Sequence, residues 1–479
     1  MSIESTVFSR KVPHRVARNT VINILGRTAN IVAMLALNIC IARVLGESVY
    51  GQYASVWALL MILGVVGSMG TDTIVVRESA KDLTRAPELV SNTITLRLCL
   101  GALAYTAAVV AASLMKADPA FVRYVAIAGL TLFVSWYILI ATYFEATLRV
   151  GRYTLITTGG AYLTLALTMV VLFMRGGLDA VLWGAVVATF ITLIVAYALV
   201  CRHFRPTLGR NLAVMRNVLS ASWPLAGFMF LVILVGRIDQ LMLLKMKGAS
   251  IAGYYAASTR IAESITLIPQ AFMLSMFPLM SFYHSGEPDR FADVYKKSLK
   301  YMSVAVLPLA LLLSFYAKPL LRLCYGQAFE HGAPALAILA WRMFFVFIGA
   351  VNSAAIIVES RQRIFFFLGS LGVGPLLALT LVLISRYGLV GAAAAAVLHQ
   401  VISHIVMLFI PSMRKYTLAP AAASFRPILA AGCAAAVMHW LRTPAGGCLG
   451  LAVYVLLLLA TRVFDKEDRD LLLRAIWRI

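Results

Sequence analysis

Four arginines lie deep inside long apolar stretches, where a charged side chain is costly. They are Arg27, Arg237, Arg260 and Arg342. A charge at the centre of a bilayer costs about 2.5–3.5 kcal/mol, so together they would cost about 10–14 kcal/mol if they faced lipid. We therefore expect them to face a cavity or a partner. Guanidinium groups bind phosphate oxygens in bidentate fashion, which predicts a site for a phosphate or diphosphate headgroup.

Polar residues accompany the first of these arginines at helical spacing. Asn23, Arg27, Asn30 and Asn38 stand at offsets of 0, 4, 7 and 15 along one apolar stretch. In a helix these offsets place them on a single stripe. The pattern predicts a polar stripe that faces inward.

Acidic residues accompany two of the other arginines, at different spacings. Asp239 is two residues from Arg237, so the two side chains do not face each other along a helix. Glu263 is three residues from Arg260, so this pair can form within one helix, and both a self-neutralised pair and a substrate role stay open. Arg342 has no acidic neighbour within four residues.

One apolar segment near residue 400 carries a cluster of polar side chains: His399, Gln400, Ser403 and His404. The cluster fits either a proton relay or hydrogen bonds between helices. We expect no cofactor. If transport is coupled to an ion, a proton or Na⁺, the candidate ion-coupling residues are Asp239, Glu263, His399 and His404.

The elements that position these residues must be membrane helices. The 479 residues are 61% hydrophobic and only 13% charged, which excludes a set of soluble domains. About 20 helical residues cross a bilayer. Fourteen apolar runs of that length predict an all-α polytopic membrane protein, and they begin near residues 20, 51, 96, 121, 154, 178, 218, 251, 301, 334, 363, 389, 422 and 445.

The chain contains an internal repeat. Residues 46–54 read GESVYGQYA and residues 248–256 read GASIAGYYA, five identities at an offset of 202 positions. Two weaker echoes preserve the order, Glu145/Arg149 with Glu359/Arg363 and Arg175-x-Gly-Leu with Arg386-x-Gly-Leu. Repetition in fixed order indicates two copies of one unit, which in membrane transporters often enclose a central binding site.

The repeat and the loops predict a domain organisation. We expect two six-helix lobes with the same orientation, related by a pseudo-two-fold axis along the membrane normal, followed by two extra helices. Lys and Arg concentrate in the amino terminus, in alternate loops and in the tail, so both termini should be cytoplasmic. The segments are a basic amino terminus (1–19), lobes at 20–200 and 218–412, a linker (201–217) and a carboxy-terminal part (413–479).

Two basic segments, 77–97 and 281–300, read as the longest loops, both on the cytoplasmic side. Their charges are those of solvated positive-inside linkers. The formal net charge of +22 largely reflects this excess of basic residues on the cytoplasmic side. The basic residues are scattered over short loops, which argues against nucleic-acid binding.

The sequence offers no sign of enzyme chemistry. The six cysteines are isolated along the chain, without the paired spacing of a metal or redox site. No phosphate loop, dinucleotide fingerprint or nucleophile elbow is present. We therefore expect a protein that is not an enzyme and does not hydrolyse ATP.

Several short motifs, in order, resemble those of one family. They are Arg18-Asn-Thr, Gly46 to Tyr53, Arg237-Ile-Asp239, Gly253-Tyr-Tyr-Ala256, Arg260-Ile-Ala-Glu263, Pro269 and Phe277-Pro278. Over about residues 18–410 the chain resembles the polysaccharide, or O-antigen, flippases of the multidrug, oligosaccharidyl-lipid and polysaccharide exporter superfamily.

The resemblance implies a two-lobed bundle that moves polyprenyl-diphosphate-linked oligosaccharide from the cytoplasmic to the periplasmic leaflet by alternating access. It implies the bacterial inner membrane, the lipid bilayer and the lipid-linked glycan as surroundings and substrate, and polysaccharide polymerase or chain-length proteins as partners. The role of binding the diphosphate falls on Arg27 by resemblance, and on Arg237, Arg260 and Arg342 by position alone.

Two other functions stay open. A multidrug or organic-cation antiporter of the same superfamily would need acidic or aromatic groups deep in a lobe. A non-transporting scaffold of a polysaccharide synthase complex would need no polar stripe, so its arginines would tolerate replacement. Which glycan the chain carries is not encoded in so apolar a sequence.

Overall fold

The computed structural model describes residues 3–115, 118–147, 150–284, 286–361, 364, 372–441, 443–461 and 463–464. The side chains of Asn23 and Glu145 lie outside this described part, as do Arg149 and Arg363. The sequence echo formed by Glu145/Arg149 and Glu359/Arg363 therefore cannot be followed in space.

Every regular element among the described residues is a helix. The first eight are α1 (Ile3–Ser68), α2 (Thr71–Lys81), α3 (Ala86–Leu114), α4 (Pro119–Val134), α5 (Tyr137–Ala146), α6 (Val150–Phe173), α7 (Leu178–Val200) and α8 (Leu212–Lys247). They are followed by α9 (Ala249–Ser264), α10 (Leu267–His284), α11 (Pro288–Phe315), α12 (Ala317–Tyr325), the 3₁₀ helix η1 (Gln327–Gly332), α13 (Ala333–Val358), α15 (Val373–Leu408), α16 (Lys415–Leu441) and α17 (Pro444–Ala460). The predicted all-α fold is confirmed.

Eleven helices in the described part are long and apolar enough to cross a membrane, and a shorter apolar helix covers Ala445–Ala460. Two of the eleven, α1 and α15, are each interrupted by a glycine with a non-helical backbone, Gly46 and Gly388. Counting each interrupted helix as two gives fourteen apolar segments, the number expected from the sequence.

The chain divides into two compact units, Met1–Ala256 and Ala257–Ile479. The first unit thus retains α8, which packs against α1, α2 and α3. In the predicted organisation a linker at 201–217 separates the lobes instead, and the lobe boundaries and their pseudo-two-fold relation stay predictions.

Packing in the first unit centres on α1, which contacts α3, α6 and α8. Small and polar residues allow a close approach between α1 and α6. Gly26 lies where a Cβ would overlap the methyl group of Thr154, and the hydroxyl of Thr158 donates to the Gly26 carbonyl at 3.1 Å. A separate apolar core joins α5, α6 and α7 around Phe144 and Ile156.

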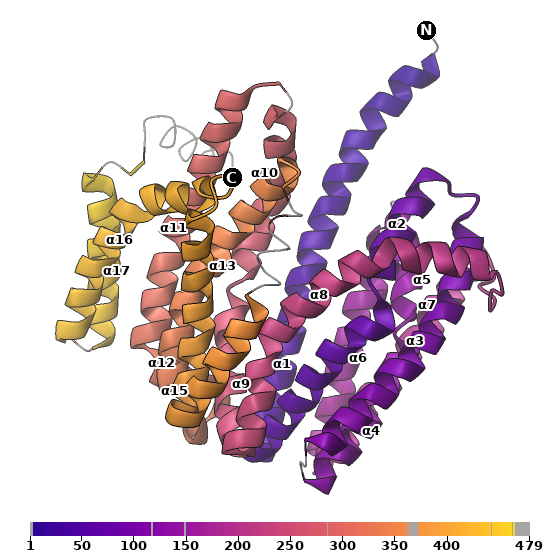
Figure 1. Cartoon of the computed structure of the whole chain (residues 1–479), viewed down its shortest axis with the longest axis horizontal. Helices are drawn as coiled ribbons and strands as arrows, with labels where there is room; N and C mark the ends of the chain where they lie inside the picture. The colour runs from indigo at the N-terminus through magenta and orange to yellow at the C-terminus, as the bar shows by residue number, and fades with distance from the viewer. Residues whose placement is uncertain are drawn as a thin grey trace. The chain divides into compact units, whose positions relative to one another are not determined.

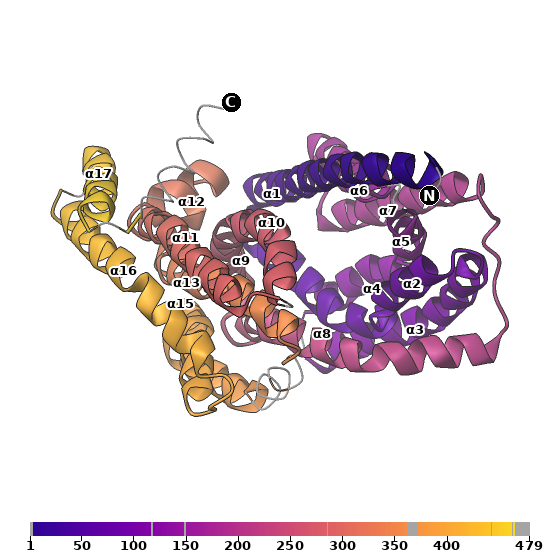
Figure 2. The same ribbon diagram turned by 90° about the horizontal axis from the view of Figure 1, so that it is seen from above.

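Hydrogen bonds between helices hold the second unit together. Tyr295 of α11 donates to the side-chain oxygen of Asn352 on α13 at 2.7 Å, and the Asn352 amide donates to the Tyr416 carbonyl of α16 at 2.7 Å. The hydroxyls of Ser303 and Ser424 lie 2.6 Å apart between α11 and α16. The helices α16 and α17 lie side by side (Figures 1 and 2).

The two basic segments expected as long loops are mostly helical, which corrects that prediction. The helix α2 continues to Lys81 and α3 already begins at Ala86, while α10 reaches His284 and α11 begins at Pro288. Charges in these segments pair within a helical turn, as Lys81 does with Glu78 at 3.1 Å. Such pairs make a charged surface compatible with helix.

The repeated segments adopt the same backbone and meet each other within the first unit. Gly46 (φ 81°, ψ 176°) and Gly248 (φ 90°, ψ 174°) have one conformation, which other residues rarely adopt. Each precedes a helical segment, and those segments touch at Gly51 and Gly253. A Cβ on Gly51 would lie 1.9 Å from the Ala249 carbonyl oxygen.

Candidate functional site

The polar stripe of the first helix serves different purposes along its length. Arg27 is exposed. The amide of Asn30 points toward the Thr157 carbonyl of α6, at 3.5 Å. Asn38 is buried, donates to the Met34 carbonyl at 2.6 Å and accepts from the Tyr50 hydroxyl at 3.1 Å. Asn30 and Asn38 thus contribute to packing, and their proposed place on a cavity stripe stays a prediction.

The acidic residue beside Arg237 has a buried partner in the next helix. Asp239 is 8% exposed and accepts a hydrogen bond from the hydroxyl of Tyr255 on α9. Its other oxygen accepts from the backbone N–H of Gln240 at 2.8 Å. Arg237 is half-buried. The carboxylate therefore fastens α8 to α9.

A short relay of hydrogen bonds continues from Asp239 to the crossing of the two repeats. The Gln240 amide donates to the Ser55 hydroxyl and to the Ala252 carbonyl, both at 3.1 Å. Ser55 donates in turn to the Gly51 carbonyl at 2.7 Å. Polar side chains from α1, α8 and α9 thus meet where the two repeated segments touch.

The structure contains an ion pair that the sequence does not predict. Its buried arginine, Arg97, is the last residue of the segment 77–97 that the sequence predicts to be a loop. Arg97 of α3 has a side chain only 1% exposed, and its terminal nitrogen lies 2.6 Å from the carboxylate of Asp72 on α2. Its Nε donates to the Thr71 hydroxyl at 2.9 Å. The signal in the sequence is an arginine inside the apolar helix α3, where a charge needs a partner. Removing Asp72 would leave the buried charge of Arg97 uncompensated.

In the second unit, Arg260 and Glu263 form the pair that their spacing allows. The two charged groups are 3.8 Å apart, with side chains 37% and 25% exposed. This separation is at the loose end of an ion pair and the groups are partly exposed, so the pair contributes little to stability.

Arg342 on α13 has one hydrogen-bonding group without a partner. Its Nε is buried and has no hydrogen-bond partner among the described residues. The neighbouring helix α15 carries His399, which interacts electrostatically with Arg342. A buried N–H without a partner is costly, so an acceptor placed beside this Nε would be favourable.

The remaining polar residues of α15 bond along their own helix. The Ser403 hydroxyl donates to the His399 carbonyl at 2.8 Å, and Nδ1 of His404 lies 2.8 Å from the Gln400 carbonyl. The His404 ring also packs against Phe345, with centroids 5.2 Å apart. Between helices, the Thr417 hydroxyl of α16 donates to the His404 backbone carbonyl at 3.1 Å.

Chemically, the described candidates separate into two kinds. Asp239 and Asp72 are held by donors or cations of their own unit, so they are poorly placed to receive an organic cation. Arg342 is half-buried and has a buried Nε without a hydrogen-bond partner among the described residues. The arrangement favours an anionic ligand over a cationic one, because guanidinium forks match phosphate and carboxylate oxygens.

Comparison with known sequences adds one family and one relative. Residues 40–334 match the family described as polysaccharide biosynthesis protein. A candidate O-antigen transporter of Shigella flexneri is 24% identical over 156 residues, which are 32% of this chain and 37% of that relative. The match spans little more than a third of the relative's length.

Comparison with solved structures reveals the same fold in several transporters. The lipid II flippase MurJ in an inward closed conformation superposes with a TM-score of 0.71 at 13% identity, over 95% of this chain and 100% of that chain. An inward-facing multidrug resistance MATE transporter of the MOP superfamily gives 0.64 at 14% identity, over 83% and 96%. A MOP superfamily transporter from Pyrococcus furiosus, described as having a binding pocket of reverse polarity, gives 0.57 at 14% identity, over 85% and 96%. At these identities the likeness establishes the fold.

Proposed function

Because the chain belongs to the family of polysaccharide biosynthesis proteins and has the fold of MOP superfamily transporters, we propose that it translocates a lipid-linked oligosaccharide across a membrane. The family match over residues 40–334 is the observation that carries the proposal. The fold likeness to a lipid II flippase supports a substrate in which a polar headgroup is attached to a lipid.

The substrate we propose is a polyprenyl-diphosphate-linked oligosaccharide repeat unit for O-antigen, capsule or exopolysaccharide synthesis. It would pass from the cytoplasmic to the periplasmic leaflet of the bacterial inner membrane, with both termini cytoplasmic. The groups assigned to the diphosphate are Arg27, Arg237, Arg260 and Arg342. The unused Nε of Arg342 gives this residue the strongest support among them.

The driving force is a second part of the proposal. Moving a doubly negative headgroup outward across a membrane that is negative inside is favoured by about 4.6 kcal/mol per 100 mV, from about 2.3 per charge. Coupling to H⁺ or Na⁺ through Asp239, Glu263, His399 or His404 is the alternative. Transport that responds to an imposed potential without either gradient would support the electrical drive, and indifference to the potential would contradict it.

The decisive experiment measures leaflet exposure of a fluorescent polyprenyl-diphosphate oligosaccharide in reconstituted vesicles. A quencher that cannot cross the membrane reports the fraction that has reached the outer leaflet. We expect protein-dependent exposure that falls at least tenfold with Arg342→Gln. The matched control is Arg123→Gln, because Arg123 lies in an exposed ion pair with Asp179 at 2.9 Å.

The likeness to MATE transporters supports one other function, export of organic cations. The same vesicles distinguish the two, because a cation exporter would move a fluorescent cation and leave the glycan lipid in place. Equal transport by the Arg342→Gln and unmodified proteins would overturn the assignment of Arg342. Absence of glycan-lipid movement, with cation movement present, would overturn the flippase proposal.

A further inference from the structure

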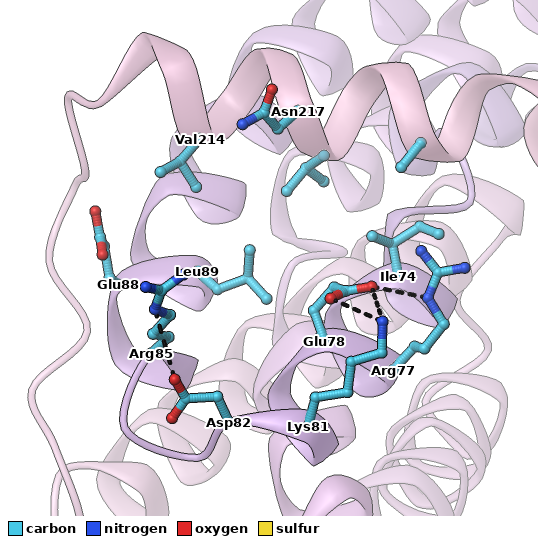
Figure 3. A pocket seen from close by; sticks show the side chains of 12 residues that line it. Ile74, Arg77, Glu78, Lys81, Asp82, Arg85, Glu88, Leu89, Val214 and Asn217 are labelled. Atoms are coloured by element: carbon cyan, nitrogen blue, oxygen red, sulfur yellow. Dashed lines mark hydrogen bonds and ion pairs between the residues drawn. The ribbon is translucent and has the colours of Figure 1, made fainter.

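A hollow in the first unit lies outside every group considered so far. It opens between α2, the short turn that leads into α3, and the first turns of α8, and its volume is about 710 Å³ (Figure 3). The helix α8 begins beside α2 and α3 (Figure 2). Six charged residues line the hollow: Arg77, Glu78, Lys81, Asp82, Arg85 and Glu88.

Three cations in this pocket are only lightly engaged. Nε of Arg77 and Nζ of Lys81 lie 2.9 and 3.1 Å from the Glu78 carboxylate, and Nε of Arg85 lies 3.5 Å from Asp82. All three are more than half exposed, and exposed pairs are weak. Because both arginines use Nε for these pairs, their terminal nitrogens are left to bind an oxyanion.

The carboxylates of the pocket provide acceptors of a second kind. Hydrogen bonds from the side chain and backbone of Thr84 hold the pKa of Asp82 below its usual value. The carboxylate is therefore ionised at neutral pH and can accept hydrogen bonds from hydroxyl groups. Cations and acceptors together suit a headgroup that carries both a phosphate and hydroxyls.

The α8 side of the pocket is largely apolar. Val214 and Val218 line it beside Asn217, and Leu89 of α3 adds an apolar side chain on the charged side (Figure 3). Nearby segments also present large apolar side chains to the surroundings, with Leu83 exposed by 54% and Leu212 by 77%. Exposed leucines beside exposed arginines are the composition of a surface at the boundary of lipid and water.

Hydrogen bonds fix the two walls relative to each other. The Asn211 side chain caps α8 by accepting from Ala213, and it donates to Glu88 of α3 at 3.1 Å. The Asn211 backbone N–H donates to the Asn92 side chain at 2.8 Å. A Cβ on Gly209 would overlap Asn92, so the chain is pressed against α3 here. The pocket is therefore preformed, as ligand sites usually are.

We propose that this pocket binds the phosphate-bearing headgroup of a membrane lipid. Arg77, Lys81 and Arg85 contact the phosphate, and the α8 face with Val214 and Val218 covers the first part of the lipid chain. Two sources share this chemistry, an anionic phospholipid of the bilayer and the glycan-carrying lipid, and binding measurements can separate them.

The test compares two charge-matched triple variants of the whole protein in detergent. The pocket variant is Arg77→Gln/Lys81→Gln/Arg85→Gln. The control is Arg123→Gln/Arg290→Gln/Arg322→Gln, three arginines elsewhere whose own side chains are exposed by 60%, 64% and 65%. Native mass spectrometry measures binding of short-chain phosphatidylglycerol. We expect at least a tenfold loss of affinity in the pocket variant and less than twofold in the control.

Further arms identify the source of the headgroup. Phosphatidylcholine and inorganic phosphate serve as comparison ligands, and a short-chain polyprenyl diphosphate represents the carrier lipid. Phosphatidylglycerol binding that polyprenyl diphosphate cannot displace assigns the site to bulk phospholipid, and efficient displacement assigns it to the carrier. Equal losses in both triple variants would mean bulk charge attraction and would overturn the proposal.

A second variant keeps the test valid if the pocket triple does not fold. Ala221 lines the apolar wall and is exposed, so Ala221→Trp fills the hollow without removing a charge. We expect Ala221→Trp to weaken phosphatidylglycerol binding at least fivefold. Unchanged binding in Ala221→Trp would contradict the proposed site, even if transport were normal.

Discussion

The two copies of the repeat, residues 46–54 and 248–256, have one backbone and different side-chain anchors. Gly46 and Gly248 share their dihedral angles, and a Cβ at either position would meet nothing within 4 Å. Gly51 and Gly253 have the opposite character, because their surroundings leave no space for a Cβ. Glycine is thus required at 46 and 248 by the backbone conformation, and at 51 and 253 by the close contact with neighbouring atoms.

The contact between Gly51 and Gly253 is reciprocal. A Cβ on Gly51 would lie 1.9 Å from the Ala249 carbonyl, and a Cβ on Gly253 would lie 2.0 Å from the Glu47 carbonyl. Each residue therefore touches the start of the other copy. Such reciprocity is the local signature of a two-fold relation between the repeated segments.

The tyrosine anchors show where the copies differ. In the first copy Tyr50 donates to Asn38, a neutral amide of the preceding segment. In the second copy Tyr255 donates to Asp239, a carboxylate of the preceding helix. The two tyrosines stand at different positions of the repeat, because Tyr50 aligns with Ala252 and Tyr255 aligns with Tyr53. The comparison teaches that duplication kept the glycine contacts, while each copy is anchored by a different tyrosine, one bonded to an amide and the other to a carboxylate.

The largest effect should come from filling the contact between the copies. Gly51→Ala and Gly253→Ala each place a methyl group against a backbone oxygen, which cannot swing aside as a side chain can. We expect each to destabilise the protein by about 3 kcal/mol, the upper part of the range for overpacking. Thermal unfolding in detergent measures the loss.

The double variant sharpens this prediction. Because both substitutions separate the same two helices, Gly51→Ala/Gly253→Ala should cost clearly less than the sum of the single changes. Fully additive losses would show that the two glycines do not share a contact. Gly227→Ala is a suitable control, because no atom lies within 4 Å of its Cβ position.

The next effect concerns the conformational glycines. Gly46→Ala and Gly248→Ala force a side chain into a backbone region that is nearly exclusive to glycine, at a cost of about 1–3 kcal/mol. The two losses should be equal, because the dihedral angles match. Unfolding midpoints that differ widely between the two variants would refute the equivalence of the copies.

A smaller effect should separate the two tyrosines. Tyr255→Phe removes a hydrogen bond to a buried carboxylate, worth about 1.5–3 kcal/mol, and Tyr50→Phe removes a neutral one, worth about 0.5–1.5 kcal/mol. Chemical unfolding of both variants should therefore show Tyr255→Phe to be less stable. Asp239→Asn converts the second anchor to the type of the first, and in that background the difference should shrink.

The smallest effect concerns the relay beneath the crossing. Ser55→Ala removes one acceptor of the Gln240 amide, which still donates to the Ala252 carbonyl. We expect a loss of about 1 kcal/mol or less. Gln240→Leu should cost more, because it removes the amide bonds to both the Ser55 hydroxyl and the Ala252 carbonyl. An equal cost for both changes would contradict this order.

Much of the fold could be read from the sequence, because bilayer thickness fixes the length of an apolar helix. The runs near residues 51 and 389 were recognised as separate segments, and the structure has Gly46 and Gly388 where they begin. The repeat located the crossing glycines. It did not reveal that these glycines touch each other, because contact requires a three-dimensional arrangement that spacing does not contain.

The candidate sites were less predictable. The spacing of Arg260 and Glu263 sufficed to foresee their pairing, since it is local to one helix. Tyr255 as the partner of Asp239 and Asp72 as the partner of Arg97 lie on other helices, so periodicity gave no indication of them. The run of charges before Arg97 predicts a loop over residues 77–97, whereas α3 already begins at Ala86.

The buried position of Arg97 has a consequence for how the protein is made. An arginine alone in the bilayer interior is costly, so α3 should leave the insertion machinery most readily when Asp72 is already beside it. The carboxylate precedes the arginine in the chain and is therefore synthesised first. The first unit would then be inserted in helical hairpins, with α2 remaining at the translocon until α3 has been synthesised.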